Sequence, residues 1–193
     1  RPGAAGALAQ ASNAVFRAGA AARNITPPLG TSINGYFNDR KAEHIHDELH
    51  ARCLVLDDGR TRLALVVCDS CMIPREVLDA AKRLVRERTG LATENILVSA
   101  THTHTAPASA GVFQTDPDAA YQQFLASRIA DAVQCAIQNL EPARIGWGVG
   151  RVPDQVFNRR WRMKPGTIAP NPFGQTNDLV RMNPPVGSAD LIA

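Results

Sequence analysis

All five histidines of the sequence fall in two short segments, ILVSATHTHTAP and HIHDELH. The first segment contains His102 and His104, one residue apart, directly after a short apolar stretch. Side chains two residues apart in an extended chain point to the same face, so these two rings share a face if the strand continues past Ala100. Two imidazoles held in this way can bind one metal ion. We interpret the pair as a metal or catalytic site, against the alternative of strand-end histidines hydrogen-bonded to nearby backbone.

Asp69 is a second candidate site residue. It ends the apolar run in ALVVCDS, and polar side chains at the end of a buried strand often serve a site. Its alternative role is to cap the following turn. If this strand and the Ile96–Ala100 strand are parallel neighbours, their ends meet, and we expect Asp69 to lie in one pocket with His102.

The HIHDELH segment gives a weaker signal. His46 could reach a site from this loop, or the segment could be a solvated loop with incidental histidines. Cys68 and Cys71 have the C-x-x-C spacing of redox and zinc motifs, but a zinc knuckle needs a second pair. We interpret them as small buried hydrophobic residues at the end of a strand.

The elements that must position these residues follow from periodicity and turn signals. A strand is predicted within 15–26, and a hairpin pairs 50–56 with 62–67 around Asp57-Asp58-Gly59. Helices are predicted from about Pro74 to Gly90 and after Asp116, which can cap the second helix. Further strands are predicted over 96–100 and 144–149. The fold class is α/β (α+β), a mixed β-sheet sandwich with packed helices.

Composition limits the functional classes. With 45% hydrophobic and 20% charged residues and a net charge of +3, the sequence is typical of a globular domain. The densest basic stretch, NRRWRMK, is too short to argue for nucleic-acid binding. Residues 1–13 are expected to be flexible, and residues 152–193 are predicted to be an irregular tail.

Several segments together resemble the neutral/alkaline ceramidase family: RNITPPLG, GYF, IHDELHARCLVLDDG, LALVVCDSCMIPREVLDAAKRL, NILVSATHTHTAP and FNRR. The resemblance covers roughly residues 14–165 and implies a secreted or membrane-associated zinc amidohydrolase acting on an N-acylsphingosine or a related lipid amide. It also implies that residues 1–193 form the N-terminal portion of one catalytic domain. The stretch TAPASAG and the HIHDELH loop depart from the family pattern.

The resemblance also implies roles for individual residues. His102 matches a zinc ligand, and His104 matches a residue beside the ion that handles protons. Asp69 matches an aspartate near the site, and Arg159 matches an arginine that could hold a substrate oxygen. His46 corresponds loosely to the mouth of the site. Zinc would lower the pKa of a bound water and polarise the scissile carbonyl.

The family's remaining zinc ligands lie beyond Ala193, so the remainder of the polypeptide or a partner chain is expected to complete the site. The chain alone is then expected to bind zinc weakly or not at all and to be inactive. We also expect a secreted or periplasmic location and association with a membrane surface. Two alternatives stay open: a non-catalytic ceramidase-like module, and a zinc hydrolase of a different small amide or ester.

Overall fold

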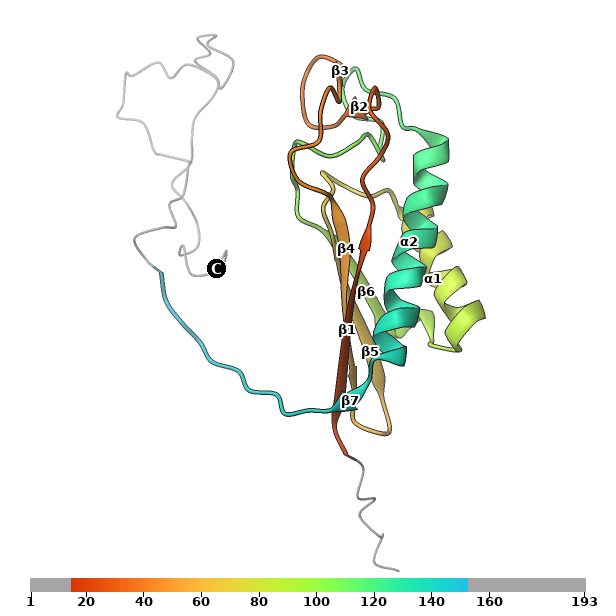
Figure 1. Cartoon of the computed structure of the whole chain (residues 1–193), viewed down its shortest axis with the longest axis vertical. Coiled ribbons are helices and arrows are strands. Elements are labelled where there is room, and N and C mark those ends of the chain that lie inside the picture. Colours follow the sequence, from red (N-terminus) through yellow and green to blue (C-terminus); the bar gives the residue numbers. More distant parts are fainter. Residues whose placement is uncertain (1–14, 153–193) are drawn as a thin grey trace, which may run out of the picture. The chain divides into compact units, whose positions relative to one another are not determined.

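The computed structural model describes residues 15–152. The chain divides into two compact units, residues 1–144 and 145–193, and all regular elements described below belong to the first. A five-stranded sheet has the order β6-β5-β4-β1-β7, and a separate two-stranded sheet pairs β2 with β3 (Figure 1). The strands are β1 (Arg17–Asn24), β2 (Ser32–Ile33), β3 (Arg40–Lys41), β4 (His50–Asp57), β5 (Arg62–Cys68), β6 (Ile96–Ala100) and β7 (Glu141–Pro142).

The hairpin of β4 and β5 is the centre of the sheet. The two strands are antiparallel and pair from Ala51 with Cys68 to Asp57 with Arg62. Asp58 and Gly59 make the turn, and Gly59 has a positive φ of 83°, which glycine adopts without a side-chain clash. The hairpin predicted from the sequence is therefore confirmed, and it places Asp69 directly after the end of β5.

Helix α1 (Arg75–Thr89) connects β5 to its parallel neighbour β6. Pro74 holds the extended backbone of the N-cap, Arg86 and Arg88 lie in the last turn, where positive charge suits the helix dipole, and Gly90 ends the helix at φ 73°. A short 3₁₀ turn (Thr93–Asn95) leads into β6. The helix and strand follow the sequence prediction, because cap, apolar stripe and terminal glycine all agree.

Helix α2 (Ala119–Gln138) begins two residues later than the predicted cap at Asp116 would place it. Its N-cap is Asp118, whose carboxylate accepts a hydrogen bond from the Tyr121 backbone N–H at 3.0 Å. Its buried side chains are Tyr121, Leu125, Ala126, Ile129, Ala130, Ala132, Val133 and Ala136. Either aspartate could satisfy the free N–H groups of a first turn, so the sequence alone does not choose between them.

The predicted strand over 144–149 is wrong, because residues 143–152 contain no strand. The last strand is instead β7, two residues long, which pairs Glu141 and Pro142 with the start of β1. Pro142 lacks a backbone N–H, and it is tolerated here because β7 is an edge strand. The alternation of residues 144–149 is typical of an extended chain, but within residues 15–152 no strand pairs with this segment.

Both helices pack on one face of the five-stranded sheet (Figure 1). Inward-facing residues of the central strands, such as Val55, Ala64 and Val66, are fully or almost fully buried against them. The residues between these positions point to the other face of the sheet. Several apolar side chains are exposed there: Leu54, Leu63, Leu65, Val67 and Leu97. The mixed sheet with helices packed on it confirms the predicted α/β fold class. Among the described residues, the helices are too short or too polar to cross a bilayer.

Candidate functional site

The site lies where β5 and β6 end side by side. The parallel ladder runs to the pair Cys68 and Ala100, and the Thr101 N–H then donates to the Cys68 carbonyl at 3.0 Å. The residues that follow each strand are therefore neighbours: Asp69 to Met72 after β5, and Thr101 to His104 after β6. This is the strand arrangement expected from the sequence.

The backbone turns at His102 instead of continuing as a strand. Strand β6 ends at Ala100, and His102 has a φ of 63°, in the left-handed region that non-glycine residues rarely adopt. The condition for a shared strand face, an extended chain past Ala100, is therefore not met. The two rings nevertheless meet, because the turn brings His102 Nε2 to 3.4 Å from His104 Nε2. Their juxtaposition comes from a strained loop and not from strand alternation.

The protonation of the His102 ring follows from its hydrogen bond. His102 Nδ1 lies 2.8 Å from the carbonyl oxygen of Cys71. A carbonyl can only accept, so Nδ1 carries the hydrogen and donates it. In the neutral ring, the lone pair is then on Nε2, the atom that faces His104. This is the way metal-binding histidines are commonly oriented in proteins.

Cys71 joins the histidine pair as a third potential ligand. One ligand atom from each of Cys71, His102 and His104 lies within 4.8 Å of the others. Cys71 is buried, as predicted, and burial raises the pKa of its thiol. Its proximity to the histidines was missed. The sequence did hold a signal for this proximity. Cys71 follows β5, the two histidines follow β6, and parallel neighbouring strands bring the residues after their ends together.

His104 rests against the segment that follows β2. Gly35 has a φ of 97°, and a Cβ at this position would lie 2.5 Å from His104 Cγ. The Tyr36 ring meets the His104 ring edge-on, with 6.0 Å between centroids, and the Arg40 guanidinium lies 3.7 Å from the centroid of the Tyr36 ring. Position 35 therefore requires glycine, because any side chain there would clash with the His104 ring.

Backbone hydrogen bonds join the loop after His104 to the β2 segment. The Asn34 N–H donates to the Ala106 carbonyl at 3.0 Å, and the Ala108 N–H donates to the Ser32 carbonyl at 2.8 Å. The buried Asn34 side chain also donates to the Ala110 carbonyl at 3.1 Å. These contacts hold the loop after His104 against the β2 segment, in addition to its attachment to β6.

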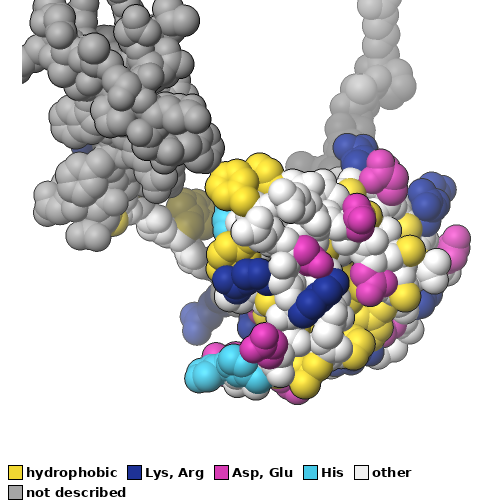
Figure 2. Space-filling model, turned by 90° about the horizontal axis from the view of Figure 1, so that it is seen from above, with side chains coloured by type: hydrophobic (Ala, Val, Ile, Leu, Met, Phe, Trp, Pro, Cys, Tyr) yellow, Lys and Arg dark blue, Asp and Glu magenta, His cyan; other side chains and the backbone are white. Residues whose placement is uncertain are grey.

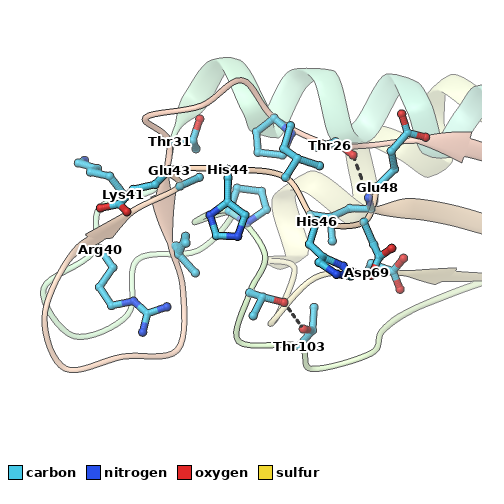
Figure 3. A pocket seen from close by; sticks show the side chains of 18 of the residues that line it. Thr26, Thr31, Arg40, Lys41, Glu43, His44, His46, Glu48, Asp69 and Thr103 are labelled. Atoms are coloured by element: carbon cyan, nitrogen blue, oxygen red, sulfur yellow. Dashed lines mark hydrogen bonds and ion pairs between the residues drawn. The ribbon is translucent and has the colours of Figure 1, made fainter.

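A cavity of about 890 Å³ lies beside this loop. Figure 3 shows His44, His46 and Asp69 among the residues around it, together with Thr103 from the loop after β6. Thr103 and Thr105 line the cavity, whereas the alternate residues His102 and His104 are not among its lining residues. Figure 2 looks onto this end of the molecule and shows acidic, basic and histidine side chains interspersed on it.

Asp69 faces this cavity and is tied to strand β4. Its Oδ2 accepts from Arg52 Nη1 at 2.6 Å and from the His50 backbone N–H at 2.9 Å, while its own N–H donates to the His50 carbonyl. The carboxylate therefore fixes the start of β4 rather than capping the turn that follows β5. It can still present its charge to a ligand in the cavity.

The remaining predicted residues have different surroundings. His46 lies in the exposed loop between β3 and β4, where its Nδ1 is 2.8 Å from an Asp47 carboxylate oxygen, and it lines the cavity. His50 begins β4 and interacts with Glu48, to whose carboxylate its Nε2 lies at 3.7 Å. The structure does not bring these two histidines into the Cys71–His102–His104 cluster. Arg159 lies outside the described residues.

Taken together, the fold and the site define an α/β protein with a histidine-centred candidate metal site after two parallel strands. The family model for neutral/alkaline non-lysosomal ceramidase, N-terminal, matches residues 16–163. The chain therefore belongs to this ceramidase family.

Relatives agree with this assignment. The neutral ceramidase of Drosophila pseudoobscura pseudoobscura is 35% identical over an alignment of 103 residues that covers 49% of this chain and 14% of that protein. The crystal structure of neutral ceramidase from Pseudomonas aeruginosa has a TM-score of 0.61 at 23% identity, and a ceramidase complexed with C2 has 0.56 at 25%. Each structural match covers 67% of this chain and 22% of the other. The chain thus corresponds to a minor part of the relatives' length.

Proposed function

We propose that the protein is a zinc-dependent amide hydrolase that cleaves an N-acyl amide such as N-acylsphingosine or a related lipid amide. The observation that carries the proposal is the paired histidines of a ceramidase-family chain, with their Nε2 atoms 3.4 Å apart and His102 oriented by the Cys71 carbonyl. The relatives named above are called ceramidases, which supports the substrate class.

The residues present fit a zinc ion. The unprotonated Nε2 of His102 offers an imidazole donor to the ion. His104 Nε2 lies 3.4 Å from it, where it could exchange a proton beside the ion. Imidazole and thiolate are also the donors that zinc prefers over oxygen-seeking ions such as magnesium. His102 would hold the ion through Nε2, and His104 faces the same position.

When bound, zinc supplies an activated water and polarises the carbonyl of the substrate. The chain's own residues supply the rest of the chemistry. His104 Nε2 would take a proton from the attacking water and return it to the leaving amine. Asp69, held by Arg52, faces the cavity from the end of β5 and would position the substrate or its hydrogen-bond partners. Arg159 is proposed to hold a substrate oxygen through its guanidinium.

The proposal is tested on the longest natural polypeptide that contains this chain. Removal of zinc with a chelator should abolish hydrolysis of N-acylsphingosine, and added zinc should restore it. His104→Gln should lower kcat by about 10²- to 10⁴-fold with a smaller effect on KM, as expected for a general acid–base group. Arg159→Lys keeps the charge but loses the two-donor geometry, so unchanged turnover would remove Arg159 from the site.

The same assay separates the alternatives. Faster cleavage of a short N-acyl amide or an ester than of the lipid amide would favour a zinc hydrolase of a different substrate. A folded polypeptide that binds zinc and cleaves none of these substrates would favour a non-catalytic module. Asp69→Asn should reduce the activity strongly and the free energy of unfolding only slightly. A loss of activity that merely follows the loss of stability would assign Asp69 a structural role. The predicted extracytoplasmic location and membrane-surface association are proposals that accompany the lipid substrate.

A further inference from the structure

We propose that Ser109 is a positioning residue for His102: its buried hydroxyl holds the turn after β5, and this turn keeps the hydrogen of the His102 ring on Nδ1. The inference rests on the proposed function, because the orientation of the ring matters when its Nε2 binds the ion. It assigns a role to a residue of the TAPASAG stretch, in which the chain departs from the family pattern.

Side chains hold the turn after β5. Within the described part of the chain, residues 70–73 form no backbone–backbone hydrogen bond. The carbonyl groups of this turn have side-chain partners instead. The Cys71 carbonyl accepts from His102 Nδ1 at 2.8 Å, and the Met72 carbonyl accepts from two hydroxyls, one of which is that of Ser109. The position of the turn therefore depends on these three donors.

The two hydroxyls that share the Met72 carbonyl come from different parts of the chain. Ser70 Oγ donates at 3.1 Å from within the turn, and Ser109 Oγ donates from the loop after His104. Both serines are fully buried, and their oxygens are 3.3 Å apart. A carbonyl oxygen has two lone pairs and each hydroxyl has one hydrogen, so both bonds can form at once. Ser109 therefore ties the turn to the histidine loop at a second point besides His102.

The backbone of Ser109 is itself fixed by neighbouring elements. Gln122 Nε2, on the first turn of α2, donates to the Ser109 carbonyl at 2.8 Å. The N–H of Asp118, the N-cap of this helix, donates to the Ala108 carbonyl at 3.1 Å, and the Ala108 N–H donates to the Ser32 carbonyl at 2.8 Å. Because α2 and β2 hold this segment, the Ser109 hydroxyl needs little ordering to reach the turn.

The link from Ser109 to the His102 ring runs through two adjacent peptide units. Peptide units are planar, so only the φ and ψ angles of Met72 separate its carbonyl from that of Cys71, and fixing one restricts the other. A neutral imidazole carries its hydrogen on either nitrogen, and the acceptor beside Nδ1 decides which. If the Cys71 carbonyl moves away, the hydrogen can move to Nε2, and the ring then offers no lone pair where the ion binds.

The test uses NMR spectra of the metal-free 193-residue chain at a pH well above the ordinary histidine pKa, where long-range couplings in the ring report which nitrogen carries the hydrogen. The His102 signals are assigned by their absence in His102→Ala. In the native chain, Nδ1 should carry the hydrogen and exchange it slowly with water. Ser109→Ala should shift part of the population to the Nε2–H form and speed the exchange. The matched control Thr89→Val, which removes another hydroxyl-to-carbonyl bond, to Val85 at 2.7 Å, should change neither.

A second pair of variants leaves the buried turn unchanged. Gln122→Ala removes the bond to the Ser109 carbonyl from a partly exposed position, and it should move the His102 signals in the same direction by a smaller amount. Its control is Gln123→Ala at the exposed neighbouring position. Unchanged His102 signals in Ser109→Ala, or in Gln122→Ala if Ser109→Ala does not fold, would overturn the inference. An Nε2–H ring in the native chain would also overturn it.

Measurements on the longest natural polypeptide separate this inference from the proposed function. Ser109→Ala should weaken Zn²⁺ binding there by about 10- to 100-fold, the usual effect of losing a group that orients a metal-binding histidine. Native zinc affinity in this variant would overturn the inference while leaving the proposed hydrolase intact. Conversely, a shifted His102 hydrogen and weaker zinc binding in a polypeptide that cleaves no amide would support the role of Ser109 and count against the hydrolase.

Discussion

At the residue scale, the backbone strain at His102 shows that its position is determined by the surrounding loop. A φ of 63° costs a non-glycine residue about 1 kcal/mol or more, and such strain concentrates at functional sites. Hydrogen bonds to neighbouring residues offset this strain. The Cys71 carbonyl accepts a hydrogen bond from the His102 ring, and the Thr101 N–H donates to the Cys68 carbonyl.

This strain predicts an order of stability. His102→Gly and His102→Ala both lose the imidazole, but only glycine accommodates the left-handed φ. We expect the glycine variant of the metal-free chain to have a free energy of unfolding about 1 kcal/mol higher than the alanine variant. Urea unfolding of both variants measures the difference. If alanine equals or exceeds glycine, the left-handed conformation at His102 is absent in solution.

A second residue-scale prediction concerns the contact beneath His104. Gly35→Ala places a Cβ within 2.6 Å of two ring atoms of His104 in addition to straining a φ of 97°. The matched control is Gly30→Ala, which strains a φ of 85° where nothing lies within 4 Å. Both variants should lose about 1 kcal/mol from backbone strain. Only Gly35→Ala should also shift the His104 ring resonances in NMR spectra.

Similar effects of the two glycine variants on the His104 resonances would mean that Gly35 does not position the ring.

The sequence identified the histidine pair because its spacing is local. It missed Cys71 and Gly35, because their contacts with His102 and His104 arise only when the β5 and β2 segments pack against the loop after β6.

At the element scale, one carboxylate joins three neighbouring strands. Asp57 at the end of β4 is nearly buried, and its Oδ2 accepts from Arg62 of β5 at 2.8 Å and from Arg17 of β1 at 3.1 Å. Its Oδ1 accepts from the Gly59 N–H of the hairpin turn at 2.8 Å. The Arg62 guanidinium, then the Gly59 N–H, hold the pKa of the Asp57 carboxyl below its usual value.

A lowered pKa in the folded state makes this contribution depend on pH. The stabilisation is fully present above the unfolded-state pKa of about 3.9 and is lost as pH falls through the lower folded-state value. Asp57→Asn should therefore reduce the free energy of unfolding by about 2 kcal/mol at pH 7, and the difference from the native chain should shrink in acid. Chemical unfolding at several pH values gives the comparison.

The matched control is Asp79→Asn on α1. Asp79 pairs with Arg75 at 3.0 Å in an exposed i,i+4 ion pair, so its loss should change the free energy of unfolding by less than about 0.5 kcal/mol. An Asp57→Asn difference that stays constant down to pH 2 would show that hydrogen-bond geometry, and not charge, accounts for the stabilisation.

The elements themselves were largely predictable from the sequence. The β4–β5 hairpin, α1 and β6 each carry a local signal: Asp58-Gly59 in the turn, Pro74 and Gly90 around the helix, and a short apolar run. The start of α2 was not determined, since Asp116 and Asp118 are both competent caps. Strand β7 was missed because pairing with β1, and not the alternation of its own residues, decides where it forms.

At the scale of the whole molecule, both helices within residues 15–152 pack on the same face of the five-stranded sheet. The opposite face exposes apolar side chains on three adjacent strands, including Leu54 of β4 and Leu65 of β5, which are direct cross-strand partners with 40% and 37% of their surfaces accessible. Apolar groups of this kind on a surface favour contact with another apolar surface. The matched relatives are several times longer than this chain, and we propose that residues 1–193 are the N-terminal portion of a longer catalytic domain.

The exposed face gives the last prediction. The double variant Leu54→Thr with Leu65→Thr keeps β-branched residues in the strands and removes exposed apolar surface. For the 193-residue chain, it should reduce fluorescence of a bound hydrophobic dye and self-association while changing the free energy of unfolding by less than about 1 kcal/mol. The control Val55→Thr, on the fully buried face of β4, should cost about 1–3 kcal/mol, because it buries a hydroxyl without a partner. If the double variant is as destabilising as Val55→Thr and leaves dye binding unchanged, this face is covered in solution and is not free to contact another apolar surface.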